Sequence, residues 1–113
     1  MKTMVLLGVV AAFLAAVGIA ADAQSEGRPA MFEEDTFKTS AGDLKITFIG
    51  HGTLVFTFAG KVIHVDPVSS AADYKTMPKA DVILVTHEHG DHLDPTAIAA
   101  LRKEGTRVLL SQS

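Results

Sequence analysis

The sequence predicts an α/β domain that opens with an antiparallel meander and continues into a parallel βαβ unit. Apolar and polar residues alternate from Leu44 onward, which is the pattern of half-buried strands. Residues 81–86 then form a short, continuous apolar run rich in β-branched side chains, which favours a strand buried on both faces. With 113 residues, the chain has room for one such domain.

The first residues show the order of charge, apolar run and small-residue site that is typical of a secretory signal peptide. Lys2 supplies the positive start, residues 4–20 carry no charge, and an Ala-Asp-Ala sequence ends at Ala23. We therefore assign residues 1–23 to a signal peptide and expect an exported protein, periplasmic or secreted, with no membrane contact after cleavage. An N-terminal membrane anchor is the alternative, because this apolar run is near the lower length limit for spanning a bilayer.

Residues 24–43 are expected to hold a linker and, near residues 36–39, a first strand. The linker is polar and irregular over residues 24–35. Its acidic run, residues 33–35, is interpreted as solvated surface, because nothing in the sequence fixes it into a metal site. The domain proper is assigned to residues 44–113.

The meander is predicted over residues 44–66. Gly60 can take the positive φ that a tight hairpin turn requires. The Asp66-Pro67 pair ends the meander, because proline cannot continue a sheet ladder. The apolar positions that share a face within each strand are Leu44, Ile46 and Phe48, then Leu54, Phe56 and Phe58, then Ile63 and Val65.

The βαβ unit is predicted from residue 81 onward. After the strand at 81–86, Asp94 is a candidate helix N-cap with Pro95 at the first helical position. Gly105 is expected to end the helix, and residues 108–110 begin another strand, parallel to the first. The histidine-rich loop thus follows the carboxyl end of a parallel strand, where α/β folds place ligands.

Composition excludes several classes of function. The formal net charge is −3 and lysine and arginine form no cluster, which argues against a nucleic-acid partner. The partner that we expect is a small-molecule substrate. The chain has no cysteine, so disulfides, a thiol nucleophile and thiolate metal ligands are all excluded. A metal site in this chain must be built from His, Asp and Glu.

Four candidate metal ligands lie within the six residues from His87 to His92. In an extended segment His87 and His89 point to the same side and can hold one ion together. Gly90 allows a turn, after which Asp91 and His92 can face a second ion. Two metals about 3.5–4 Å apart make a hydrolytic centre. The zincin pattern fails, because a second histidine four residues after His87 is replaced by Asp91.

The H-x-H-x-D-H pattern of residues 87–92 resembles the metallo-β-lactamase-fold superfamily of metal-dependent hydrolases. The segment Ile49-Gly50-His51-Gly52 and the segment Val65-Asp66-Pro67 are similar to the branch of that superfamily that includes ascorbate-lactonase-like proteins. The resemblance covers roughly residues 44–110. It implies a four-layer α/β/β/α sandwich of two similar halves, of which this α/β chain would be the N-terminal part.

The resemblance also implies a role for each loop residue. His87 and His89 would bind the first metal, and Asp91 and His92 the second. Asp91 would be the catalytic residue that orients the attacking water. The ions would be Zn²⁺, two in the complete enzyme, with iron or manganese as alternatives.

Three further residues have possible roles outside the loop. Asp66 and His51 each have two interpretations, and His64 has one. Asp66 matches a family aspartate that supports the metal loop through hydrogen bonds, and a strand-end turn former is the equal alternative. His51 would lie near the mouth of the metal site or serve as a hydrogen-bonded turn histidine. His64 is expected to be structural.

In the family, the remaining ligands come from the second half of the sandwich, whereas no histidine follows His92 here. We therefore expect a fragment of a metal-dependent hydrolase that uses metal-activated water on an ester, lactone, amide or phosphodiester, with an apolar sheet face left exposed. The alternative is a non-catalytic metal-binding or interaction module. A redox protein of the same fold that uses iron is a third hypothesis. Oligomeric state is left open.

Overall fold

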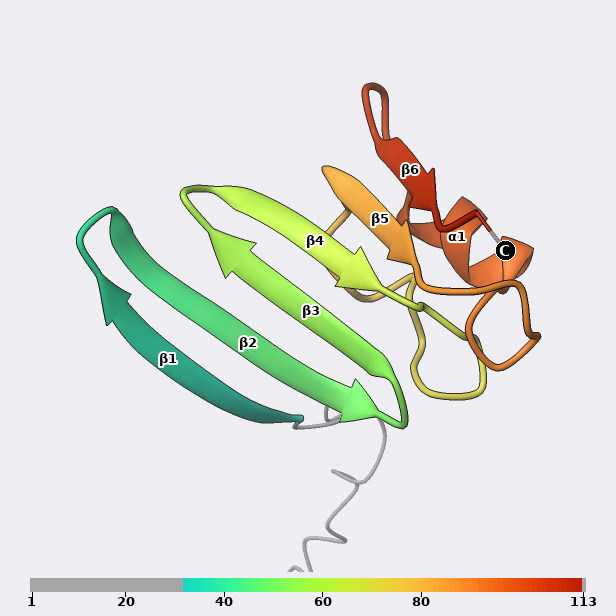
Figure 1. Cartoon of the computed structure of the whole chain (residues 1–113), viewed down its shortest axis with the longest axis horizontal. Helices are drawn as coiled ribbons and strands as arrows, with labels where there is room; N and C mark the ends of the chain where they lie inside the picture. Colours follow the sequence, from blue (N-terminus) through green and yellow to red (C-terminus); the bar gives the residue numbers. More distant parts are fainter. Residues whose placement is uncertain (1–31, 113) are drawn as a thin grey trace, which may run out of the picture.

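The computed structural model describes residues 32–112, which form one six-stranded mixed sheet and one short helix (Figure 1). The strands lie side by side in chain order from β1 at one edge to β6 at the other. The signal peptide expected at residues 1–23 lies outside the described residues. Within residues 32–112, no helix has the length and apolar character needed to cross a bilayer. The elements are β1 (Glu33–Thr39), β2 (Gly42–Gly50), β3 (Thr53–Phe58), β4 (Lys61–Val65), β5 (Val82–Val85), α1 (Pro95–Leu101) and β6 (Arg107–Leu110).

The first four strands form the antiparallel meander that the sequence predicts. The β3–β4 turn consists of Ala59 and Gly60, both with positive φ, as a two-residue hairpin loop of the favoured twist requires. The first strand is longer than predicted and begins at Glu33, so the acidic run lies in β1 and not in a linker. There Glu34 accepts hydrogen bonds from Lys45 and Thr47 of β2, which attach this edge strand to the sheet.

The last strands confirm the parallel unit, since β5 pairs in parallel with both β4 and β6. Helix α1 connects β5 to β6 and has Asp94 as its N-cap, whose side chain accepts from the backbone N–H groups of Thr96 and Ala97. The helix ends at Leu101, so the prediction that it continues to Gly105 is wrong. Gly105, with φ of 82°, instead forms the turn before β6.

Only one face of the sheet is covered by the described residues. Helix α1 and the loop before β5 pack on it, and the fully buried Ile83 and Leu101 lie at the centre of this core. The prediction that β5 is buried on both faces is therefore wrong for residues 32–112, where its side chains alternate between buried and half-buried. The opposite surface, called the bare face below, carries alternating apolar residues of the meander and of the two parallel strands that follow it. These are Leu44, Ile46, Phe48, Leu54, Phe56, Ile63 and Val65 of the meander, Leu84 of β5 and Leu109 of β6.

His64 lies on the covered face, fully buried, with its ring edge against Tyr74. Its Nε2–H donates to the carbonyl of Pro78, at 3.0 Å, and its Nδ1 has no partner among the described residues. Burial lowers the pKa of His64, and the hydrogen bond to Pro78 offsets only part of that effect. The structural role expected for this residue is consistent with these contacts.

A pH dependence of stability follows from His64. Its folded-state pKa lies below the ordinary value of 6.5, so the unfolded chain takes up the proton first as the pH falls. The free energy of unfolding is therefore unaffected by the protonation of His64 above about pH 6.5. Below that pH it decreases, until the pH reaches the lower, folded-state pKa of His64. We expect H64L to remove this part of the pH dependence, measured by urea unfolding between pH 5 and 7.5. An unchanged slope in H64L would contradict it.

Candidate metal centre

The site is built on the loop between β5 and α1, which begins at Thr86 where the parallel strand ends. Two backbone hydrogen bonds, from His92 and Leu93 to the carbonyl of His89, close a tight turn in this loop. The turn folds the loop back, so that His92 returns beside His87 with 3.9 Å between the ring centroids. Histidines that are five residues apart in sequence are thereby brought to one place.

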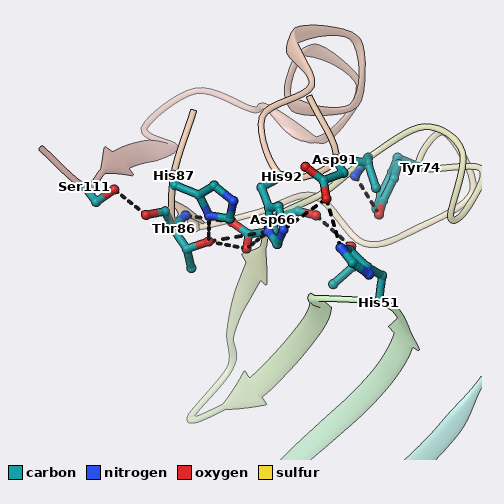
Figure 2. Close-up of polar contacts among 10 residues, drawn as sticks. His51, Asp66, Tyr74, Thr86, His87, Asp91, His92 and Ser111 are labelled. Atoms are coloured by element: carbon teal, nitrogen blue, oxygen red, sulfur yellow. Dashed lines mark hydrogen bonds and ion pairs between the residues drawn. The ribbon is translucent and has the colours of Figure 1, made fainter. Parts of the chain in front are cut away.

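Asp66 supports the loop from below (Figure 2). It follows β4 directly, has a φ of 45°, and is only 2% exposed. Its Oδ1 accepts from the backbone N–H of Thr86 at 2.7 Å, and its Oδ2 accepts from the Thr86 hydroxyl at 2.6 Å. Oδ2 also accepts from Nδ1 of His92 at 2.7 Å. Burial alone would raise the pKa of Asp66, but the hydrogen bonds from Thr86 and His92 outweigh it and lower that pKa.

These contacts fix the orientation of His92. Because Nδ1 donates to Asp66, the lone pair of the neutral ring lies on Nε2, which faces Asp91 with 3.5 Å to Oδ2. Gly52 leaves room for the ring: a Cβ at that position would lie 2.9 Å from Cε1 of His92. A carboxylate behind a histidine is the arrangement that orients metal-binding imidazoles in proteins.

His51 reaches the same place from a different element, the β2–β3 turn. Its Nε2 lies 3.1 Å from Oδ2 of Asp91 and its ring centroid lies 5.2 Å from that of His92. Figure 2 shows His51 below Asp91 and pointing to it. Desolvation would raise the pKa of Asp91, but hydrogen bonds to its own backbone and to His51 lower it, as does the nearby His92.

The donor atoms form two overlapping groups, in each of which all atoms lie within 4.8 Å of one another. Asp91 belongs to both groups. Imidazole nitrogens with one carboxylate are a suitable ligand set for zinc, iron or manganese, so the residues present fit a divalent metal. The groups are His87, His89 and Asp91, and His51, Asp91 and His92.

An open cavity of about 390 Å³ adjoins the second group. His51 and Asp91 form one side of it, and its other walls come from the end of β2 and the loop after β4. Of its remaining lining residues only Ser70 carries a polar side chain; the others are Ile49, Gly50, Val68 and Ala71.

The structure thus brings together every residue that the sequence singled out for the site. His64 lies elsewhere, in the core. Sequence reasoning missed Thr86, which joins Asp66 to the loop, although a polar residue at the end of an apolar strand was a usable signal. It also missed Ser69, whose backbone N–H donates to the side chain of Asp94 and ties the loop after β4 to the start of α1.

Comparison with known proteins identifies the family. A family model described as "Beta-lactamase superfamily domain" matches residues 45–111, more than half of the chain. A UPF0173 metal-dependent hydrolase from Flavobacterium johnsoniae is 49% identical over 63 residues, which are 50% of this chain and 28% of that protein. A UPF0173 metal-dependent hydrolase from a Geobacillus species is 44% identical over 57 residues, which are 47% of this chain and 25% of that protein.

A solved structure agrees in fold as well as in sequence. The crystal structure of a proposed metal-dependent hydrolase from Parabacteroides distasonis superimposes with a TM-score of 0.67 at 58% identity. The match covers 69% of this chain and 36% of that one. The six-stranded sheet with its one helix therefore matches part of a metallo-β-lactamase-like fold. The chain spans between a quarter and a third of the length of these curated relatives.

Proposed function

The chain belongs to the beta-lactamase superfamily, and on that premise we propose that its histidine and aspartate cluster is the metal centre of a metal-dependent hydrolase. The observation that carries this proposal is the pair of donor groups that share Asp91 and rest on Asp66. A buried carboxylate that holds a histidine by one nitrogen leaves the other nitrogen free for a metal. A surface loop with incidental histidines would not need this support.

His87 and His89 would hold one ion, Asp91 and His92 a second, and zinc is the ion that we propose. Bound ions of this kind supply the Lewis acidity that activates water for attack on a carbonyl or phosphoryl group. Oδ2 of Asp91 lies 3.1 Å from Nε2 of His51, and Oδ1 would orient the water or take its proton. The hydrogen bonds between Asp66 and Thr86 would hold the loop in place around the ions.

We further propose that the parent fold is the four-layer sandwich of the ascorbate-lactonase-like branch, with the bare face packed against its second half. The bare face supports this, because its apolar side chains have no cover among residues 32–112. Phe48 and Leu109, for example, are 38% and 47% exposed. The greater length of the relatives provides the residues that such a second half needs.

The test is hydrolysis by the purified chain in the presence of Zn²⁺, with p-nitrophenyl acetate and bis-p-nitrophenyl phosphate as probes. We expect metal-dependent turnover that H89A lowers by at least ~100-fold, since even the outer partners of metal ligands cost about 10–100-fold. E88A is the matched control, because Glu88 lies in the same loop but in neither donor group. Turnover that survives H89A or removal of the metal would exclude the proposal.

A second candidate function is a metal-binding module without catalysis. The group of His87 and His89 favours this function. Among the described residues its third member is Asp91, which also belongs to the other group, so His87 and His89 have no third ligand of their own. The same experiment separates the two: stoichiometric zinc binding without turnover on either probe would support the module and exclude the hydrolase for this chain.

A further inference from the structure

We propose that His51 is a third ligand of the second metal position, so that His51, Asp91 and His92 form a three-residue metal site. The inference rests on the proposed function, because it takes Asp91 and His92 to be metal ligands. It extends that function by assigning His51 a direct contact with the ion, where the proposed function gives it no such contact. The residues come from two distant elements, the β2–β3 turn and the loop after β5.

The separations of the donor atoms fit an ion between them. Two ligands that are each about 2.1 Å from a tetrahedral zinc lie about 3.4 Å apart. The distance from His51 Nε2 to Asp91 Oδ2 is 3.1 Å, and that from Asp91 Oδ2 to His92 Nε2 is 3.5 Å. The donor atoms of His51 and His92 are no more than 4.8 Å apart. The side chain of His51 is 63% exposed, so surrounding side chains leave its ring room to turn toward an ion.

The backbone at the β2–β3 turn has the form that such a role needs. His51 has a φ of 52°, the left-handed conformation that tight hairpin turns use and that histidine adopts more often than most residues other than glycine. Gly50 and Gly52 flank it, and Gly52 gives the ring of His92 the space it occupies. The turn thus presents one imidazole to Asp91 while it leaves room for another.

These three residues would form a zinc site of the catalytic type from the described residues alone. Such sites have three protein ligands and keep a further position open. The cavity of about 390 Å³ begins at His51 and Asp91, so the open position has access from it. Within residues 32–112, the group of His87 and His89 reaches three members only by sharing Asp91, and we expect the first ion to enter the His51 site.

The experiment is a titration of the full chain with Co²⁺, followed by its absorption spectrum and by calorimetry. The H87A/H89A double variant is expected to bind one Co²⁺ with an affinity within about threefold of the tightest site of the unmodified chain. Adding H51A to it is expected to weaken that binding by at least ~30-fold and to shift the absorption bands, as loss of an imidazole ligand does. Urea unfolding checks that each variant is folded.

H51Q in the same double variant separates a ligand from a hydrogen-bond donor. Glutamine can donate a hydrogen bond to Asp91 but lacks the imidazole nitrogen, so we expect H51Q to bind as weakly as H51A. Recovery of the affinity by H51Q would overturn the proposal and make His51 a positioning residue for Asp91. No Co²⁺ bound by the unmodified chain would instead exclude the proposed function, which makes the two failures distinguishable.

Discussion

Replacement of Asp66 by alanine is expected to lower the free energy of unfolding by about 3 kcal/mol, because it removes a buried carboxylate that accepts three hydrogen bonds. The change leaves the N–H and hydroxyl of Thr86 without their acceptor, and it frees the ring of His92. Alanine also tolerates the positive φ of this position poorly. We expect zinc affinity to fall by about 10–100-fold in the same variant, the usual cost of losing the partner of a metal-binding histidine.

Urea unfolding and a zinc titration measure the two effects separately. D66N keeps the size of the side chain and suits the positive φ, but it offers one acceptor oxygen where the carboxylate offers two. It should therefore recover part of the stability and less of the affinity. D43A is the control, because Asp43 is an exposed carboxylate in β2 whose side chain, among residues 32–112, pairs with Lys38 alone. Wild-type stability in D66A would show that the contacts to Thr86 and His92 do not support the loop.

Replacement of His92 by alanine is expected to abolish most of the stabilisation that zinc provides. A ligand at about 100 times its Kd stabilises the folded state by about 2.7 kcal/mol. His92 is the residue through which Asp66 and the metal would be linked, since Nδ1 donates to Asp66 and Nε2 faces Asp91. H92A removes this link, and we expect a zinc-induced stabilisation below about 0.5 kcal/mol at the same zinc concentration.

Thermal unfolding with and without zinc, supported by urea unfolding, measures this loss. Without metal, H92A should also be less stable by about 1–2 kcal/mol, because Asp66 loses one of its donors. E88A should respond to zinc as the unmodified chain does. A full zinc response in H92A would mean that the ion binds elsewhere, and the group of His87 and His89 would then be the site to test.

Local patterns were sufficient for the order of elements and for the candidate ligands in the loop after β5. Alternation from Leu44 predicted the meander, and the apolar run with its capped helix predicted the parallel unit. The errors also have local causes. The acidic residues at the start of β1 gave no apolar signal, because this edge strand is exposed along its whole length. The predicted helix was too long because the helix already ends at Leu101, where Arg102 becomes extended, and Gly105 belongs to a later turn.

The sequence by itself determined which residue types gather in the loop after β5, since their spacing is a local property of residues 87–92. It also determined which alternate residues share a face of each strand, because side chains in a strand have a period of two. It could not determine which face α1 would cover, and the face that received the helix is not the one richest in large apolar residues.

Only the tertiary structure decided how the loop is supported and what lies next to it. Asp66 is separated from His92 by 26 residues, and His51 from Asp91 by 40. Contacts over such separations depend on the pairing and register of β2, β3, β4 and β5, which bring the ends of distant strands to one edge of the sheet. No short-range sequence pattern predicts which strand ends will lie together. Their position depends on the backbone hydrogen bonds and the burial of side chains across the whole sheet.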